Sequence, residues 1–189
     1  MIKLFSYTLI FCFSLSVFSQ KIEKETKVPS NKIPNLAKIF IENAVDSKKV
    51  KWYFEKNEHG NSYEAKFKLK RSKTSIEFDL QGNLQDVEIE ISNSKIPRRV
   101  QKKMSKYFKA YFSKFKIQKI QKQFRGIKTV LLDQIRNLSI LKKDPTFYEI
   151  VVFGKSKSEL KTIEFLFDIS GNLISSKTVI QSNTDHIAY

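Results

Sequence analysis

The sequence predicts an α+β protein built as a tandem repeat, in which each copy is one helix followed by an antiparallel sheet of about four strands. Three observations support this: two Ile-Pro segments that each precede an amphipathic stretch, a Phe-Asp-x-x-Gly-Asn-Leu motif that occurs twice, and apolar-polar alternation around both copies of the motif. The predicted organisation has five segments, which are a signal peptide over 1–19, a flexible leader over 20–30, a first repeat over 31–92, a second repeat over 93–182 with an insertion at about 126–144, and a C-terminal tail over 183–189.

The first twenty residues have the pattern of a signal peptide. Lys3 is the only charged residue before Lys21, and an apolar run follows it. Val17 and Ser19 stand at the minus-three and minus-one positions of a cut after Ser19, so we expect a periplasmic or secreted protein. No later apolar run approaches the length of a membrane span, so we expect no transmembrane segment in the mature chain.

The single cysteine, Cys12, lies inside this segment. The mature chain would therefore contain no thiol, which excludes a disulfide, a thiolate nucleophile and a cysteine-based zinc site. The residues that follow, 20–30, are polar and include Glu23, Glu25 and Pro29, which favours a short flexible leader.

Each repeat opens on a capping residue followed by Lys-Ile-Pro, at Asn31 and again at Ser94. Proline is tolerated in the first helical turn because the amide that it lacks has no partner there. Spacings of three and four residues then predict two helices with apolar faces. The expected core face is Leu36, Ile39, Phe40 and Ala44 or Val45 in the first helix and Val100, Met104, Phe108, Tyr111 and Phe115 in the second.

The repeated Phe-Asp-x-x-Gly-Asn-Leu motif, at 78–84 and 167–173, predicts a hairpin turn with a bulge. Its Asp can accept hydrogen bonds from the turn amides, and its Gly can adopt a positive φ before the returning strand. Asp79 and Asp168 are each explained by their own turn, so we assign neither a catalytic role. Around the first motif the alternation places Val87 and Ile89 on the core face of a half-buried strand and directs Glu88 outward.

Further strands are expected at 50–56, 62–70 and 116–124, before the two copies diverge. The insertion at about 126–144 is rich in Leu, Ile and Val, and it fits either a short helix or an extra strand.

The paired Ile-Pro helices, the strands that carry Tyr-Glu at 63–64 and 148–149, and the two hairpin motifs resemble the PepSY-like proteins described as beta-lactamase-inhibitor-like. The resemblance covers residues 31–180 and rests on structural motifs. It implies tandem helix-on-sheet units in a bacterial envelope protein that binds or inhibits another envelope protein without catalysing a reaction. The chain has no mature cysteine and no copy of the inhibitory loops of beta-lactamase inhibitor protein, so lactamase inhibition itself does not carry over.

The chain is strongly basic, with a formal net charge of +16, and residues 91–132 contain thirteen Lys or Arg and no acidic residue. The bases opposite the apolar stripe of the second helix are Arg99, Lys102, Lys103, Lys106 and Lys109. Such a face is typical of a solvated surface, and it also suits an anionic polymer or anionic lipid headgroups. Nucleic acid is disfavoured as a partner because the chain is expected to be exported and has no basic-aromatic reader motif.

Trp52 is the remaining candidate for partner binding, with a core role as its alternative, since one of the two faces of its strand must belong to the core. His59 and His186 lie far apart, so we expect no metal site and no cofactor. Without a thiol, an HExxH motif or a phosphate loop among five glycines, we expect a binding protein and not an enzyme. Its partner is predicted to be another envelope protein, with an anionic polymer or membrane surface as the alternative.

Overall fold

The structure is a computed structural model that describes residues 19–57 and 60–181. It has an α+β fold with three α-helices and nine strands. The helices are α1 (Asn35–Ala44), α2 (Arg98–Tyr111) and α3 (Lys128–Arg136). The strands are β1 (Ser19–Val28), β2 (Lys51–Asn57), β3 (Gly60–Leu69), β4 (Ser72–Phe78), β5 (Leu84–Glu90), β6 (Lys114–Phe124), β7 (Phe147–Ser156), β8 (Glu159–Asp168) and β9 (Leu173–Gln181).

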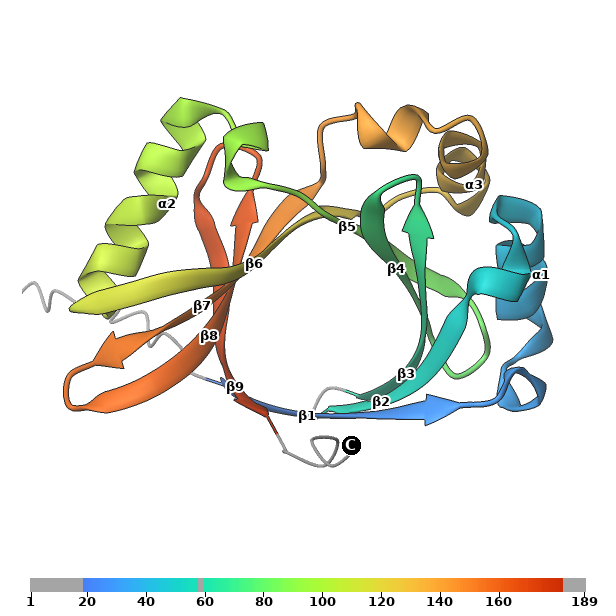
Figure 1. Ribbon diagram of the computed structural model, residues 1–189, viewed down its shortest axis with the longest axis horizontal. Coiled ribbons are helices and arrows are strands. Elements are labelled where there is room, and N and C mark those ends of the chain that lie inside the picture. The colour runs from blue at the N-terminus through green and yellow to red at the C-terminus, as the bar shows by residue number, and fades with distance from the viewer. Residues whose placement is uncertain (1–18, 58–59, 182–189) are drawn as a thin grey trace, which may run out of the picture.

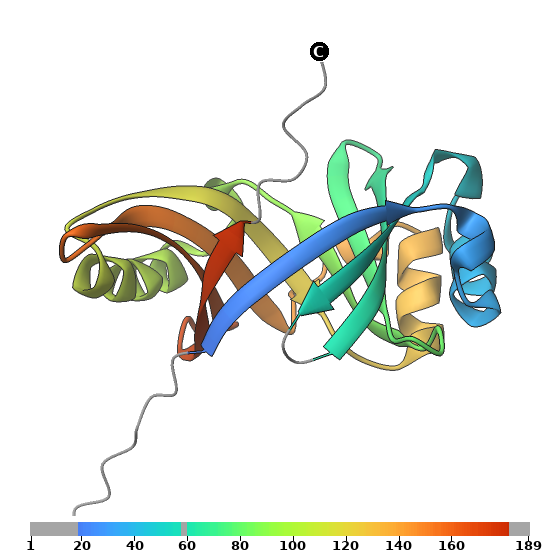
Figure 2. The same ribbon diagram turned by 90° about the horizontal axis from the view of Figure 1, so that it is seen from below.

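The nine strands form one closed sheet in which every strand is antiparallel to the next along the chain. The ring is closed by β1, which pairs in parallel with β9 through residues 19–23 and antiparallel with β2 through residues 24–28. Figure 2 shows β1 as one long strand that runs across both halves of the molecule. The residues that were expected to form a flexible leader, 20–30, therefore mostly belong to β1. Residues 1–18 of the predicted signal peptide lie outside the described residues, and so does the predicted C-terminal tail, 183–189.

All three helices lie outside the ring, as Figure 1 shows. Helices α1 and α3 cover the half formed by β2–β5, and α2 covers the half formed by β6–β9. Each half has its own apolar core between helix and sheet, one centred on Phe40 and Phe78 and the other on Phe108 and Phe165. Because the outward-facing residues of the strands build these cores, the other face of every strand is directed into the ring.

The isoleucine of each Ile-Pro segment is buried, with Ile33 3% and Ile96 2% exposed, so it anchors the start of the helix that follows. The buried face of α1 is Ala37, Phe40, Ile41 and Ala44. The expected core positions Leu36 and Ile39 are instead 46% and 52% exposed. The prediction was wrong for these two residues because Ala37 and Ile41 complete the same helical spacing on the side that meets the sheet.

Both hairpin turns have the predicted geometry. Asp79 Oδ1 accepts hydrogen bonds from the amides of Gln81 and Asn83, at 2.9 and 2.8 Å, and Asp168 makes the equivalent bonds in its own turn. Gly82 has a φ of +87°, and a register shift follows in each pair of strands, as expected for a bulge. Burial opposes ionisation of Asp79, but the hydrogen bonds from Asn83 and the turn amides outweigh it and lower the pKa of this carboxyl.

The insertion at about 126–144 contains a helix, α3, followed by a turn of 3-10 helix at Ser139–Leu141. Its apolar residues Leu131, Ile135 and Ile140 are buried in the core of the first half, beside α1. The insertion therefore forms a helix and not an extra strand. Although the insertion lies in the second half of the sequence, its helix completes the core of the first half.

Candidate functional site

The basic residues of α2 form an exposed face, which we call the α2 basic face (Arg99, Lys102, Lys103, Lys106 and Lys109). Four of these side chains are exposed and Lys103 is half-buried. The Lys103 ammonium donates a hydrogen bond to Oδ1 of Asn172, in the second hairpin turn. Over residues 19–57 and 60–181, none of the five forms an ion pair with an acidic side chain.

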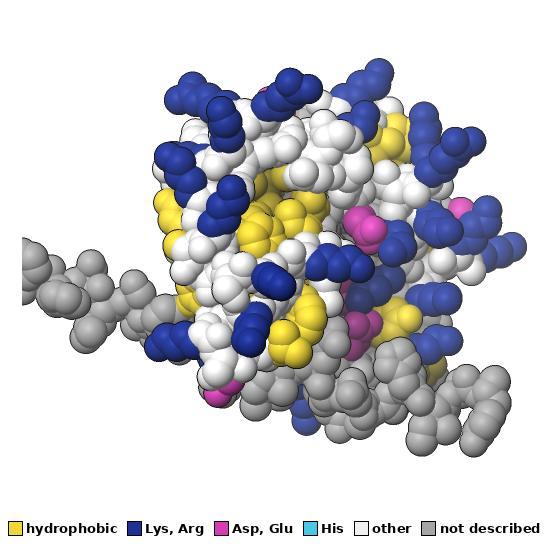
Figure 3. All heavy atoms as spheres, turned by 60° about the vertical axis from the view of Figure 1, so that its left-hand side comes forward, with side chains coloured by type: hydrophobic (Ala, Val, Ile, Leu, Met, Phe, Trp, Pro, Cys, Tyr) yellow, Lys and Arg dark blue, Asp and Glu magenta, His cyan; other side chains and the backbone are white. Residues whose placement is uncertain are grey.

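A groove of about 860 Å³ lies between α2, β6 and β7, and two residues of the α2 basic face, Arg99 and Lys102, line it. Its apolar lining is Met104, Phe108, Phe115, Ile117 and Ile150, and its basic lining is Arg98, Arg99 and Lys102. Figure 3 shows hydrophobic side chains in a hollow on this side of the molecule, with Lys and Arg side chains around it. The predicted bases Arg99 and Lys102 therefore lie on the rim of an apolar groove, which the helix periodicity alone did not indicate.

Trp52 is not part of this surface. It is 7% exposed and packs in the core of the first half, with its ring centroid 5.9 Å from that of Phe78. Its strand places Trp52 toward α1, whereas its neighbours Tyr53 and Glu55 have the opposite orientation. Of the two roles considered for Trp52, the structure therefore places it in the core and not at an exposed anchor position.

A second candidate site lies inside the ring of strands, where a cavity of about 330 Å³ is lined almost wholly by polar side chains. We call it the interior cavity. Its charged lining consists of eight acidic and four basic side chains, although the whole chain carries 35 Lys or Arg against 19 Asp or Glu. The acidic residues are Glu25, Glu55, Glu64, Glu77, Asp86, Glu88, Glu149 and Glu164, and the basic residues are Lys66, Lys119, Arg125 and Lys177.

Strand register explains why these residues meet. Glu64 on β3 lies opposite Glu77 on β4, which lies opposite Asp86 on β5. One step along the ring, Glu88 lies opposite Gln123 on β6. Since alternate residues of a strand share a face, these side chains all project into the ring, while their neighbours build the two outer cores. Glu88 was expected to point outward to solvent, and it faces the interior because the sheet closes on itself.

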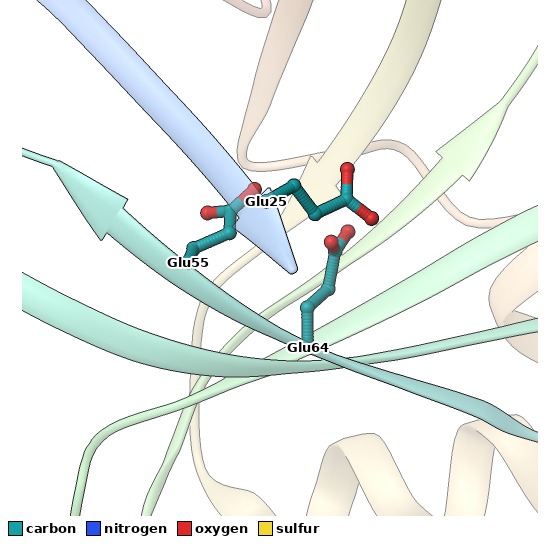
Figure 4. A group of neighbouring side chains, drawn as sticks. All are labelled: Glu25, Glu55 and Glu64. Carbon is teal, nitrogen blue, oxygen red and sulfur yellow. The ribbon is translucent and has the colours of Figure 1, made fainter. Parts of the chain in front are cut away.

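At one side of the cavity, Glu25, Glu55 and Glu64 come from three adjacent strands and lie close together, with the carboxylate of Glu25 turned toward that of Glu64, as Figure 4 shows. One carboxylate oxygen from each lies within 4.8 Å of the others, an arrangement that could hold a metal ion. The ammonium group of Lys66, however, lies 2.9 Å from both Glu25 Oε1 and Glu64 Oε2. A metal ion at this position would have to displace a lysine that already pairs with two of the three carboxylates.

Asp86, the most buried carboxylate of the cavity, shares one amide donor with Glu88. Gln123 Nε2 donates to Asp86 Oδ2 and to Glu88 Oε1, both at 3.1 Å. The two oxygens therefore lie at most about 6 Å apart, where two negative charges repel by about 3 kcal/mol at an effective dielectric constant near 20. Arg125 Nε, at 3.7 Å from Asp86 Oδ2, only partly offsets this repulsion because its side chain is 52% exposed.

This environment holds protons on the carboxyl groups. Burial, and after it the Glu77 carboxylate, raise the pKa of Asp86 well above its ordinary value. Burial and the neighbouring Asp86 do the same to the pKa of Glu88, against the partial offset of Lys119. The ammonium group of Lys119 lies 3.6 Å from Glu149 Oε1, and attraction to Glu149 and Glu88 outweighs its own burial and raises its pKa.

Apart from Glu64 Oε2, which lies 2.9 Å from the Lys66 ammonium group, three polar atoms of the interior cavity lack a hydrogen-bond partner in the part of the chain that the structure describes. They are Ser62 Oγ, Asp86 Oδ1 and Gln123 Oε1. Their residues are 3%, 3% and 4% exposed, so bulk water does not readily solvate them. Buried polar atoms are almost always satisfied in folded proteins, and such exceptions call for a specific explanation.

Sequence reasoning did not find the interior cavity. The signal was present as polar residues at alternate positions of several strands, for example Glu64 on β3 and Glu77 on β4. On an open sheet these positions would face solvent, and only closure of the ring by β1 makes them an interior.

Among residues 19–57 and 60–181, no helix has both the length and the apolar character needed to cross a bilayer.

No protein-family model and no curated protein sequence matches the chain. Three solved structures are similar to it. A DUF2874 family protein from Bacteroides ovatus ATCC 8483 is 11% identical, with a TM-score of 0.47, over 77% of this chain and 87% of that one. A protein from Bacteroides eggerthii DSM 20697, described as a periplasmic candidate, is 11% identical, with a TM-score of 0.49, over 77% and 88% of the two chains.

The third structure is a BLIP-like protein from Bacteroides fragilis NCTC 9343, which is 18% identical, with a TM-score of 0.46, over 84% of this chain and 92% of that one. A BLIP-like protein is thus one of the solved structures to which this chain is similar.

Proposed function

We propose that the chain is an exported, non-catalytic binding protein of the bacterial envelope, and that it binds or inhibits another envelope protein through the α2 basic face. The observation that carries this proposal is the groove beside α2, with its apolar lining of buried and half-buried side chains and its rim of exposed bases. Interfaces commonly combine an apolar centre with a polar rim, and arginine is enriched in them relative to the rest of the surface.

The expected partner has an acidic surface that surrounds a protruding apolar side chain. The apolar side chain would fill the groove above Phe108 and Phe115, and the acidic groups would pair with Arg99 and Lys102. Because bases of the α2 basic face have no acidic partner within the described residues, such a partner would not have to break an existing ion pair. Charge pairs at the rim contribute mainly to the rate of association and its salt dependence, whereas the apolar contact slows dissociation.

We also infer that the two halves of the chain are copies of one helix-and-sheet unit. Support comes from the order of elements, since α1 precedes β2–β5 and α2 precedes β6–β9. The equivalent hydrogen bonds of Asp79 and Asp168, each followed by a bulge, add to it. The α2 basic face belongs to the second copy only, because α1 carries a single base, Lys38. On this inference the second copy acquired the binding surface.

The second candidate function is binding of anionic polymer or lipid headgroups through the same face. It is favoured by the density of charge, since α2 has six bases and no acidic residue among its 14 residues. Such binding depends on the release of counterions, so it weakens steeply with salt and does not need the groove.

The test is a pull-down from envelope extract with the purified protein at low and high salt. The variant carries Glu in place of Lys102, Lys103, Lys106 and Lys109. A matched control makes the same change of charge at exposed lysines elsewhere, namely Lys32, Lys48, Lys70 and Lys142. A photo-crosslinking residue at position 105, which lines the groove, identifies what occupies it.

Protein binding predicts one protein that crosslinks at position 105, stays bound at high salt and is lost from the α2 variant but not from the control. Capture of heterogeneous anionic material, or binding to anionic vesicles that salt abolishes, would favour the second function. Equal retention by wild type, variant and control would refute a role for the α2 basic face in either function.

A further inference from the structure

The interior cavity has an excess of negative charge in a protein that is otherwise strongly basic. Eight of the 19 acidic residues of the chain line it, against four of the 35 basic residues. Lys66 is already engaged by Glu25 and Glu64, and Lys119 by Glu149. Among the described residues, the region around Asp86, Glu88 and Glu77 therefore has only partial counter-charge, from the exposed Arg125 guanidinium near Asp86 and from Lys119, which Glu149 shares with Glu88.

The unsatisfied atoms in this region are hydrogen-bond acceptors. Gln123 Oε1 is an amide oxygen and can only accept, Asp86 Oδ1 can only accept once its carboxyl is ionised, and Ser62 Oγ can accept or donate. Asp86 and Gln123 are in direct contact through their other atoms, so their free oxygens belong to one local cluster. A ligand that satisfies this cluster must bring hydrogen-bond donors and positive charge.

An organic ammonium ion fits this description better than a metal ion does. A primary ammonium group has three N–H donors, and the chain itself places one, that of Lys66, against carboxylates of the same cavity at 2.9 Å. Calcium needs six to eight oxygen ligands and magnesium a near-octahedral set. In the one group of three converging carboxylates found among the described residues, two of the three already pair with Lys66.

The cavity has the size and the access that a small ligand needs. Its volume of about 330 Å³ is at the lower end of the range for small-molecule sites, about 300–1,000 Å³. Gly60, Asn61 and Gln85 are part of its lining and are exposed, so it reaches the surface beside β3 and β5.

We propose that the interior cavity is a binding site for a small primary amine, with Asp86, Glu88 and Gln123 as the groups that contact its ammonium end. This site is separate from the α2 basic face, so either proposal can fail without the other. A bound ammonium ion replaces the protons that Asp86 and Glu88 otherwise retain, and amine binding therefore releases protons. The charged groups that surround this pair are Glu64 on β3, Glu77 on β4, Lys119 and Arg125 on β6, Glu149 on β7 and Glu164 on β8.

The experiment is isothermal titration calorimetry of the purified protein with the diamine cadaverine, in two buffers of different ionisation enthalpy at about pH 7. Butylamine tests a single ammonium group. Tetramethylammonium is the matched ligand control, because it carries the same charge without an N–H donor. Magnesium and calcium ions test the metal alternative.

The protein variants are Asp86→Asn and Glu88→Gln, which keep the shape of each side chain and remove its charge. Glu90→Gln is the matched control, since Glu90 lies on the same strand and face but pairs with Lys73 at 3.2 Å. Circular dichroism and a thermal melt of each variant establish that it is folded.

We expect saturable binding of cadaverine and butylamine, with release of about one proton per ligand. Asp86→Asn and Glu88→Gln should each weaken binding by at least about tenfold, while Glu90→Gln leaves it unchanged. Absence of amine binding up to about 10 mM would overturn the proposal, and so would binding of tetramethylammonium as tight as that of butylamine. It would equally be overturned by binding of magnesium or calcium without amine, or by full amine affinity in folded Asp86→Asn.

Discussion

Replacement of Asp86 by Asn should stabilise the protein, and the gain should grow as the pH rises. Asp86 is 3% exposed and sits beside Glu77 and Glu88 with only partial compensation from Arg125. In the folded protein, the Asp86 carboxyl therefore stays protonated to a higher pH than it does in the unfolded chain, where its pKa is ordinary. Asparagine has the same shape and needs no proton to stay neutral.

The magnitude follows from the difference in protons bound. The environment raises the pKa of Asp86 from 3.8 to about 8, so between these values the unfolded state binds fewer protons than the folded state. The free energy of unfolding of the wild type therefore falls as pH rises through this window, by about 1.4 kcal/mol per pH unit for one proton. From about pH 5 to about pH 8, the advantage of Asp86→Asn over wild type should increase by up to about 4 kcal/mol.

The assay is urea unfolding of wild type and Asp86→Asn at several pH values between about 5 and about 8, with the difference in free energy of unfolding taken at each pH. Taking the difference cancels titrations that the two proteins share. Glu90→Gln, on the same strand, should show no gain of this size. A difference that stays constant with pH, or a loss of stability in Asp86→Asn that grows with pH, would mean that Asp86 is ionised and well paired, and the reasoning would be refuted.

Three further substitutions test the fold. Asp168→Ala removes three hydrogen bonds of the second hairpin turn and should lower the free energy of unfolding by about 2 kcal/mol, measured by urea unfolding; an unchanged midpoint would show that the turn does not depend on this side chain. Gly82→Ala places a methyl group 2.9 Å from the backbone N of Ala37 at a φ of +87°, so it should lower the free energy of unfolding by more than about 1 kcal/mol. Gly126→Ala is the control, because a methyl group there has nothing within 4 Å. Equal effects of the two substitutions on the thermal midpoint would contradict the packing of this turn on α1. Trp52→Ala should lower the free energy of unfolding by about 3–5 kcal/mol as a core deletion, and full stability with loss of partner binding would instead make Trp52 an exposed anchor.

The local elements of the fold could be predicted because their signals are local. Helix start sites follow from Ile-Pro, and Ile33 and Ile96 are buried where these sites require an anchor. The hairpin turns could be predicted because each is encoded within seven residues of sequence. In the first turn, Asp79 accepts hydrogen bonds from the turn amides and Gly82 adopts a positive φ. The strands could be predicted because apolar and polar residues alternate along them with a period of two.

Long-range pairing could not be predicted in the same way. Residues 19–23 pair with residues 177–181 at the other end of the chain, and no local pattern in the polar leader distinguishes a strand from a flexible segment. This closure decides where Glu64, Asp86 and Glu88 lie, so the error in one strand carried over to the candidate site. The helix of the insertion was left open for a related reason, since Ile135 is buried against the half of the chain that precedes it.

Charge was interpreted correctly for the exterior and incompletely for the interior. The bases of α2 lie on an exposed helix face, as their spacing predicted. The net charge of +16, however, conceals a separation between a basic exterior and an acidic interior, because a sum over the sequence carries no information on position. The two surfaces call for ligands of opposite charge.

The most direct test of the interior cavity as a site for ammonium ions is an NMR titration of the side-chain carboxyl carbons of Asp86 and Glu88 against pH, without and with cadaverine. We predict that both groups titrate well above the ordinary range for a carboxyl in the free protein and that their pKa values fall when the amine binds. If both groups titrate at ordinary values, or at raised values that the amine leaves unchanged, the interior does not bind ammonium ions in the way that its geometry indicates.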